Sequence, residues 1–488
     1  MSRTAIAFVL CLLVAGCTAP TAQTQEPTAG PDSRITTEGS ASEAVAPETT
    51  DSVVGTDGST VNATATANPT ATAGTTTASE TTVSEVQDDD ISVSGGSLPV
   101  EHDPIFDRTT GLLGANVSPP AVISVEPAAK IEADRAATPG NESGARHFVG
   151  VMGIGSDGRD GEGSDEDGDE TDEGVAVAAY VSSAHSVVVN ERMTAPGRER
   201  ALERTLAHEF VHTVQFRQNA PERVQRELDL RYSYSLDRYL TYVSVVEGTA
   251  VFVADAYDER YLSGNATTVT SRERYRSASS GVKFSIARYY FGGRYVASRF
   301  DAPENVSQLY DDPPRTTEQL LHGDANASEE PRFLAVQVRP GENRSLGPRN
   351  TNGELFTRIA LGTELNESRT AAAAAGWGAD ELAVVEPERR SGNRSFVWAT
   401  RWDSPAEADE FASAIQAYLD SRAERATAGT SGTESDAIWR DGSLSFRTER
   451  VGDETVVLLV GEEPFVRSAT VSGANASVSV STSKSAES

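Results

Sequence analysis

The clearest hydrophobic pattern in the chain lies between residues 198 and 218, where apolar side chains recur at every fourth position. Leu202, Leu206, Phe210 and Val214 would share one face of a helix with 3.6 residues per turn. A stripe of this kind is typical of a helix that packs against a core. The pattern therefore predicts a helix from about Arg198 to Gln218.

A second helical pattern runs from Ser235 to about Ala256. Its apolar positions repeat with helical spacing at Leu236, Leu240, Val243, Val246, Ala250 and Val253. Glu247 stands in the middle of this apolar segment and is followed by Gly248. Because a small residue leaves room for another backbone, this helix could approach the first one closely.

The remaining periodic segments mix strands and helices. Strand-like runs cover 147–154, 175–189, 395–400, 437–439, 444–446 and 456–460, and the last two are joined through the turn at Gly452-Asp453. Helices are expected over 366–375 and after Ser404, where Pro405 and Glu407 complete a capping box. The mixture predicts an α+β fold, with a mostly helical active region and a smaller C-terminal α+β unit.

Three segments lack any hydrophobic period. Thr18 to about Gly96 is rich in Thr, Ser, Ala, Pro, Glu and Gly and could not bury enough apolar surface to offset its ordering entropy. Ser156 to Gly174 is acidic and Gly-rich, and Glu170 stands where a calcium loop would need its turn glycine, so a solvated loop is favoured. The Ser-rich tail from Ser468 is expected to be loose.

The N-terminus is typical of a lipoprotein signal peptide. Arg3 supplies a positive charge, residues 5–14 are apolar but too short to span a bilayer, and Val14-Ala15-Gly16-Cys17 is similar to a lipobox. Lipid on Cys17 would anchor the chain to the extracellular face of the membrane, although cleavage elsewhere and simple secretion is the alternative. The expected organisation is a signal peptide (1–16), a tether (17–97), a zincin-like domain (98–330), a C-terminal subdomain (331–467) and a flexible tail (468–488).

The amino-acid composition indicates the environment of the protein and limits the kinds of partner and metal ligand that it can have. The net charge is −31, and lysine occurs only at Lys130, Lys283 and Lys484, which is typical of halophilic proteins. Nucleic-acid binding is excluded because phosphate contacts need clustered Lys and Arg. The only cysteines are Cys11 and Cys17, so any metal in the body must be held by His and carboxylate. Sequons at Asn116, Asn265, Asn305, Asn326, Asn343, Asn366, Asn393 and Asn475 are consistent with a surface glycoprotein.

The candidate chemistry lies in the first predicted helix. His208 and His212 are one turn apart and would stack on one face, a spacing that suits tetrahedral Zn²⁺. Glu209 follows the first histidine and could act as general base on a metal-bound water. The alternative is two helix histidines satisfied by hydrogen bonds, but the chain has only 6 histidines in 488 residues.

A catalytic zinc site needs a third protein ligand and one open position. Glu247 is the candidate, because a carboxylate inside an apolar helix is unfavourable unless it is paired or bound to metal. The alternative is a buried ion pair of Glu247 with Arg238 or Arg204.

The sequence from Thr205 to Gln215, followed by Glu247-Gly248-Thr249-Ala250, resembles the gluzincin class of zinc metallopeptidases. More narrowly, it is similar to secreted metallopeptidase-like proteins and haloarchaeal surface lipoproteins. The resemblance continues at 289–296, 313–322, 376–380 and 402–403, and covers roughly 147–461. It implies His208, His212 and Glu247 as zinc ligands and Glu209 as the base. One departure concerns the Asp that thermolysin-like gluzincins place four residues after the ligand Glu, because Val251 occupies that position here.

Hydrolysis of a carbonyl also requires a group that stabilises the oxyanion. The candidates are Tyr257, Tyr289, Tyr290 and His322, and for each the alternative is a structural role, as a core aromatic or a helix cap. The function expected is a lipid-anchored zinc metallopeptidase acting on a peptide or protein substrate. The alternative is a non-enzymatic or degenerate envelope-binding lipoprotein of a halophilic archaeon.

Overall fold

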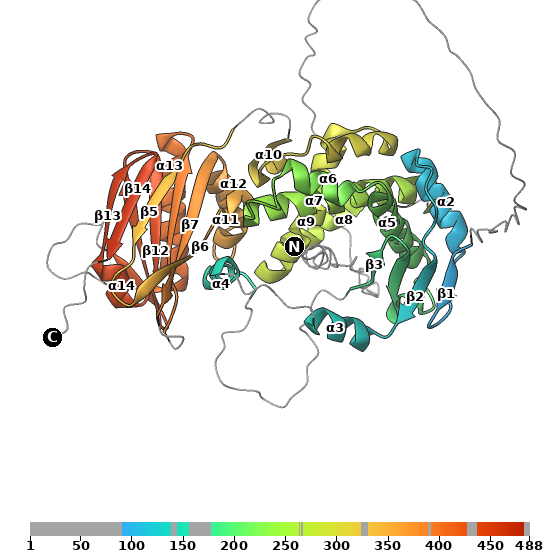
Figure 1. Ribbon diagram of the computed structural model, residues 1–488, viewed down its shortest axis with the longest axis horizontal. Helices are drawn as coiled ribbons and strands as arrows, with labels where there is room; N and C mark the ends of the chain where they lie inside the picture. The colour runs from blue at the N-terminus through green and yellow to red at the C-terminus, as the bar shows by residue number, and fades with distance from the viewer. Residues whose placement is uncertain are drawn as a thin grey trace, which may run out of the picture. The chain divides into compact units, whose positions relative to one another are not determined.

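The computed structural model describes residues 90–137, 144–155, 177–262, 264, 267–323, 330–388, 392–426 and 437–482. Its contacts divide the chain into two units, of which Pro20–Asp88 lies outside the described residues. Every element below belongs to the other unit. Helices and several sheets occur together in it (Figure 1), which confirms the predicted α+β fold class.

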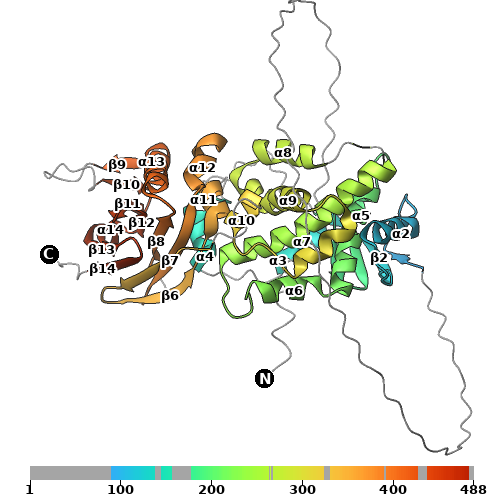
Figure 2. The ribbon, with the colours of Figure 1, turned by 90° about the horizontal axis from the view of Figure 1, so that it is seen from above.

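Three long helices form the centre of the helical part. They are α5 (Glu199–Arg217), α7 (Leu236–Tyr257) and α9 (Ser280–Arg299), and both α5 and α9 pack against α7 (Figure 2). The bounds of α5 and α7 confirm the two helices predicted from the apolar periodicity. At the crossing of α7 and α9, a Cβ on Gly248 would overlap the backbone of Gly292. The two backbones are therefore in direct contact, which only glycine permits.

A small sheet packs against α5 through its strand β3 (Ala179–Ser183). Its strand order is β1 (Ser92–Ser94), β2 (Val122–Glu126), β4 (Ser186–Asn190) and β3. Strands β1, β2 and β4 are parallel, and β3 returns antiparallel to β4. The shorter helices of this part are α2 (His102–Leu113), α3 (Ala128–Ala137), η3 (Glu191–Thr194), α6 (Ala220–Glu227), η4 (Asp258–Leu262), α8 (Thr267–Ser277), η5 (Pro303–Tyr310) and α10 (Thr317–His322).

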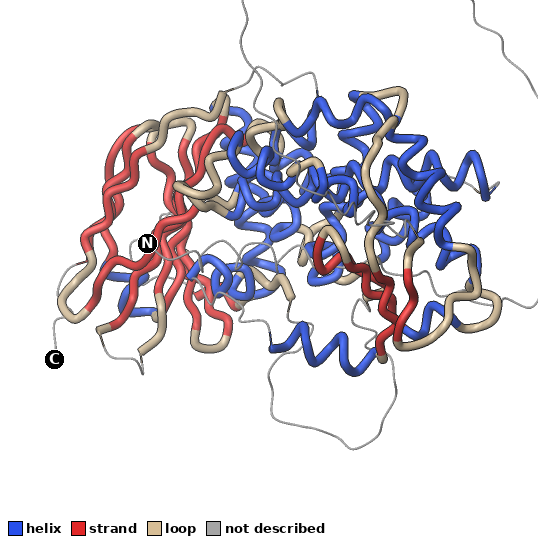
Figure 3. Tube along the Cα trace, turned by 45° about the vertical axis from the view of Figure 1, so that its right-hand side comes forward, coloured by secondary structure: helices blue, strands red, loops and turns tan. Residues whose placement is uncertain are grey.

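The C-terminal part is built on a larger antiparallel sheet, so that the strands form two separate groups in Figure 3. Its strand order is β6 (Arg344–Asn350), β7 (Trp377–Pro387), β8 (Ser395–Trp402), β12 (Thr455–Gly461), β11 (Leu444–Val451), β10 (Ile438–Asp441) and β9 (Glu424–Ala426). Strands β8, β11 and β12 confirm the predicted runs. Strand β7 has no counterpart among the sequence expectations.

Helices cover one face of this sheet. They are α11 (Gly353–Leu361), α12 (Glu367–Ala374), which was predicted, and α13 (Pro405–Arg422), whose first turn is capped by the Ser404 hydroxyl accepting from the backbone N–H of Glu407. Phe411 and Ile415 of α13 pack with Phe396 and Trp398, which lie on this face of β8.

A second, three-stranded sheet covers the opposite face. Its order is β13 (Ala469–Ala474), β14 (Ser477–Thr482) and β5 (Ala335–Arg339), and α14 (Glu463–Ser468) leads into it. Its valines pack on Val397 and Val457 of the larger sheet. The predicted flexible tail over 468–488 is therefore wrong as far as 482. Alternating Val and Ser place Val478 and Val480 inward with Ser outward, and this period-2 pattern was obscured by the serine content.

Three other expectations fail. Residues 147–154 do not form a strand, because Gly144–Val151 is helix α4. This short apolar run was ambiguous by periodicity alone. Helix α4 also packs on the C-terminal part, with the Phe148 ring against Phe356, Phe396 and Trp398, so the boundary at 330 does not separate the two cores. The tether boundary at 97 lies too late, since β1 begins at Ser92. The rest of the tether and the acidic loop lie outside the described residues.

Buried hydrogen bonds hold the N-terminus of α7 to the C-terminal part, where the Leu236 N–H donates to Asn350 Oδ1 at 2.8 Å, and to helix α10. The Asp237 carboxylate accepts from the Thr317 backbone N–H and hydroxyl at 2.9 and 2.6 Å. Gly353, at φ +85°, lies so close to Asp237 and Thr317 that a Cβ would overlap both side chains. On the other side of this glycine, the Asp380 carboxylate accepts from the Gly353 N–H and from the indole N–H of Trp398. The helix that carries Glu247 is thereby fixed at its start.

Candidate metal centre

Helix α5 places its two histidines by burying the predicted stripe. Leu202, Leu206 and Phe210 are fully buried, and each such side chain contributes about 1.5–3 kcal/mol relative to exposure. With this face fixed on the core, His208 and His212 point together toward α7, and their rings lie 4.8 Å apart.

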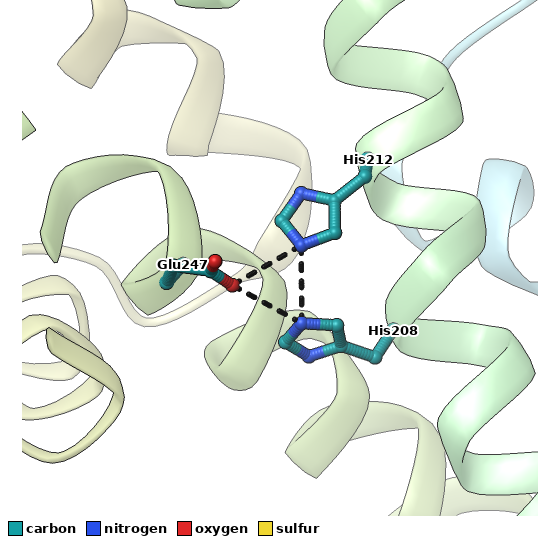
Figure 4. A group of neighbouring side chains, drawn as sticks. All are labelled: His208, His212 and Glu247. Carbon is teal, nitrogen blue, oxygen red and sulfur yellow. Dashed lines mark hydrogen bonds and ion pairs between the residues drawn. The ribbon is translucent and has the colours of Figure 1, made fainter. Parts of the chain in front are cut away.

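Helix α7 supplies the carboxylate. The close backbone contact at Gly248 brings α9 against one side of α7, and Glu247 projects from an adjacent position toward α5 (Figure 4). The Glu247 side chain is only 2% exposed, and its carboxylate lies against both imidazoles. The alternative ion pairs have other partners, because Arg204 binds Asp255 at 2.9 Å and Arg238 donates to the Ser233 carbonyl.

The three side chains have the spacing of a metal site. His212 Nε2 lies 3.1 Å from His208 Nε2 and 3.2 Å from Glu247 Oε2, and His208 Nε2 lies 3.5 Å from the same oxygen. Ligands about 2.0–2.1 Å from a tetrahedral ion are separated from one another by about 3.3–3.4 Å. His208, His212 and Glu247 therefore form a buried group that could bind a metal ion, and the predicted convergence of the three is confirmed.

The pKa values of the three side chains are shifted by burial and by their mutual interactions. Burial lowers the pKa of His208 to about 4, with the nearby His212 acting in the same direction. Burial also opposes the charged forms of His212 and Glu247, but their mutual attraction outweighs it. The pKa of His212 is raised to about 9 and that of Glu247 is lowered to about 2. At pH 7 His208 is thus neutral and Glu247 ionised, which are the forms that bind metal, whereas His212 is protonated and would release its proton when a cation binds.

Gln215 takes the place of the missing carboxylate behind the histidine. Its Oε1 lies 2.7 Å from His212 Nδ1, so the Nδ1–H can donate to it and Nε2 is directed toward Glu247. The Gln215 amide in turn donates to the Val246 carbonyl and to the Tyr310 hydroxyl. Because Gln215 follows His212 by three residues, helical spacing was the available signal, but the sequence analysis had not assigned it this role.

Glu209 is also buried, at 2% exposure, and its charge contributes to raising the pKa of His212. Its position on α5, between the two histidine ligands, is the one that the motif predicts for a base. The structure thus places a second carboxylate beside the triad.

The four candidates for oxyanion stabilisation fall in different places. The Tyr289 ring lies 6.2 Å from that of His208, so it borders the triad. The Tyr257 hydroxyl donates to Glu203 at 2.7 Å, the Tyr290 ring stacks on Tyr275 in the core, and His322 contacts Glu354 at 3.0 Å. These described contacts favour structural roles for Tyr257, Tyr290 and His322.

Arg288 was missed by the sequence analysis. It precedes Tyr289 on α9, is half-buried, and carries its guanidinium 5.1 Å from the centre of the Tyr289 ring. Burial opposes its charge, but Tyr289, Glu247 and Tyr239 outweigh burial and raise the pKa of the guanidinium. No sequence signal marked it, because its proximity to Glu247 arises only from the crossing of α7 and α9.

Comparison with known proteins extends only to the C-terminal part. A family model described as a domain of unknown function, DUF8575, matches residues 344–470, from β6 to the start of β13. Neither the curated proteins nor the solved structures contain a match to the chain. The matched segment does not include the triad, so the metal-binding helices have to be interpreted from their own geometry.

The expected lipid attachment lies beyond the structural description, since Cys17 is outside the described residues. Among the described residues, no helix combines the length and the apolar character that a bilayer span requires.

Two of the predicted glycosylation sequons differ in accessibility. The Asn475 side chain accepts hydrogen bonds from the backbone N–H groups of Asp453 and Glu454, whereas Asn305 is exposed on η5.

Proposed function

We propose that this chain is a zinc metallopeptidase of the gluzincin type, which hydrolyses peptide bonds. The observation that carries the proposal is the buried His208–His212–Glu247 triad, whose mutual distances suit a tetrahedral ion. Two imidazoles and a carboxylate are the donors that zinc prefers when no cysteine is present, and zinc binding would displace the proton of His212. Glu209, whose charge acts on His212, supports a hydrolytic site over a purely structural one, because a base is needed for hydrolysis.

The residues of the chain would divide the chemistry among them. Zinc, when bound, would supply a Lewis acid that activates water and polarises the carbonyl. Glu209 would accept the proton of the attacking water and return it to the leaving amine. Tyr289, beside His208, is the best-placed of the four candidates to hydrogen-bond the developing oxyanion. Gln215 would hold the His212 ring in orientation.

We place this activity at the extracellular face of the membrane, in a salt-adapted archaeon. Support comes from the lipobox ending at Cys17, the Thr/Ser-rich segment that follows it, and the net charge of −31 with only three lysines, Lys130, Lys283 and Lys484. In concentrated salt the Debye length falls to about 3 Å, so the repulsion among surface carboxylates is largely screened.

The test uses the full chain without its signal peptide, purified in high salt. Metal content and cleavage of a peptide library are measured for the native protein, Glu209→Ala and Glu247→Ala. We expect Glu209→Ala to retain zinc and to lose about 10²- to 10⁴-fold in activity, because a general base is removed. Glu247→Ala should lose zinc.

Glu199→Gln is the matched control, since it changes an exposed glutamate in the first turn of the same helix. It should keep both zinc and activity. A native protein that binds zinc but cleaves no peptide would instead favour the envelope-binding alternative. Absence of zinc binding at the triad would remove the basis of the proposal.

A further inference from the structure

The feature that the proposed chemistry leaves unused is the guanidinium of Arg288. Arg288 lies on α9 one turn before Gly292, the residue that touches α7 next to Glu247. Its guanidinium lies over the Tyr289 ring at 5.1 Å, and that ring lies 6.2 Å from the ring of His208. A single aromatic side chain thus separates the arginine from a metal ligand.

Arg288 is hydrogen-bonded to the neighbouring Tyr289 and attracted by the charge of Glu247, but within the described part of the chain it lacks the directly contacting carboxylate that a half-buried arginine normally has. Among the described residues, no carboxylate lies within ion-pair distance of it, although Arg204 and Arg200 on the neighbouring α5 bind Asp255 and Asp258. Its Nε is buried without a hydrogen-bond partner. Because an unpaired buried donor is unfavourable, this guanidinium is suited to a ligand that brings its own acceptor oxygens.

The balance of charges around the triad and Arg288 favours an anionic ligand. A divalent ion would offset the two carboxylates, Glu209 and Glu247, and leave the charge of Arg288 in excess. The chain as a whole carries a net charge of −31, so an anionic group would approach the metal only where such a local cation attracts it. Arginine also binds a carboxylate through two parallel hydrogen bonds.

We propose that Arg288 binds the C-terminal carboxylate of a peptide substrate, which would make the site a carboxypeptidase-type exopeptidase. This inference rests on the proposed metallopeptidase function and defines its substrate class. The guanidinium lies 5.1 Å from the centre of the Tyr289 ring, and that ring lies 6.2 Å from the His208 ring, so the guanidinium is at most about 11 Å from the His208 ring. An extended chain advances about 3.3–3.6 Å per residue. The scissile bond would therefore lie one to three residues from the C-terminus of the substrate.

The test measures binding to the zinc-loaded full chain in high salt by calorimetry. The probes are 2-benzylsuccinate, which offers one carboxylate to the metal and one to Arg288, and a monoamide of it that keeps a single carboxylate. We expect the diacid to bind roughly 10- to 100-fold more tightly, as one charge-assisted bidentate contact predicts. Arg288→Met should reduce that ratio to near one at unchanged zinc content.

Arg294→Gln is the matched control, because Arg294 lies on the same helix, is exposed, and contacts Tyr290 rather than the triad. It should preserve the native ratio. Where Arg288→Met fails to retain zinc, Arg288→Lys takes its place, and a ratio between the native value and one supports the inference. A ratio that is the same in the native protein and the Arg288 variants overturns it.

A second measurement separates this inference from the proposed function. Two N-acetylated peptide pools are compared, one with free C-termini and one with C-terminal amides. Equal cleavage of both pools overturns the exopeptidase inference and leaves the metallopeptidase proposal intact. No cleavage of either pool, with an Arg288-dependent preference for the diacid, overturns the metallopeptidase proposal and retains Arg288 as a carboxylate-binding residue.

Discussion

Besides the three candidate ligands His208, His212 and Glu247, the metal centre depends on single side chains that orient these ligands or add charge beside them. His208, His212 and Glu247 could be identified from spacing and from the anomaly of a carboxylate in an apolar helix. Gln215 and Arg288 could not be assigned in the same way, because their roles depend on which atoms face them across a helix crossing. The Tyr310 hydroxyl that supports Gln215 comes from a segment 95 residues away. Periodicity carries no information about such contacts.

The hydrogen bond from Gln215 to His212 leads to a prediction about metal affinity. Gln215→Leu should weaken zinc binding about 10- to 100-fold, because an unsupported imidazole can rotate away from the ligand geometry. Gln215→Glu retains an acceptor for the Nδ1–H and should recover a large part of the affinity. Competition with a chromophoric chelator measures both. Native affinity in the Leu variant would show that the ring is oriented by packing alone.

Whether a helix or strand could be predicted from the sequence depended on its length and on how regularly its apolar residues repeat. Helices α5 and α7 were predictable because each repeats its apolar positions over several turns. Helix α4 was mistaken for a strand, since eight residues show too little of either period. Strand β7 was missed because Asp380 and Glu381 interrupt its apolar run, and the burial of Asp380 makes sense only with the indole donors of Trp377 and Trp398.

The crossing of α7 and α9 gives a prediction about stability. Gly248→Ala should lower the free energy of unfolding by at least about 2 kcal/mol and reduce zinc content, because the added methyl group would overlap the Gly292 backbone. Gly111→Ala on α2 is the control, since nothing lies within 4 Å of its Cβ position. That exposed helical site should gain up to about 1 kcal/mol. Denaturant titration in high salt distinguishes the two, and equal effects would contradict the close contact.

At the level of the whole molecule, the helical and sheet parts are joined more intimately than the sequence suggested. The boundaries at 330 and 467 followed changes in composition. However, α4, which precedes the first boundary, packs on the C-terminal part, and β13 and β14, which follow the second, pack on its larger sheet. These contacts join residues hundreds of positions apart, for example the Tyr418 hydroxyl and the Met152 carbonyl. The hydrophobic periodicity of a segment indicates its secondary structure, but it does not indicate which distant part of the chain the segment packs against.

The junction at Asp237 makes stability depend on pH. Burial, aided by Asp380 and opposed by Thr317, raises the pKa of Asp237 to about 7. Between about pH 4 and pH 7 the folded state therefore binds more protons at this site than the unfolded state, so its stabilising contribution falls as pH rises and is absent above pH 7. The change is at most about 1.4 kcal/mol per pH unit.

Asp237→Asn removes this titration while keeping an acceptor oxygen for Thr317. Relative to the native chain, the variant should gain thermal stability as pH is raised from 5 to 8. Asp107→Asn, at an exposed position on α2, serves as the control and should follow the native protein throughout. Parallel melting curves for Asp237→Asn and the native chain at every pH would contradict the assignment.

The backbone contact between Gly248 and Gly292 also bears on how a metal ion would enter and leave. Since α7 is held by main-chain contact along its middle and by Thr317 at its start, Glu247 cannot withdraw from the imidazoles by sliding its helix. The cage is pre-organised, unlike small zinc domains that fold only around their ion. Exchange of one metal for another would then be governed by ligand chemistry and access, with no refolding step to slow it.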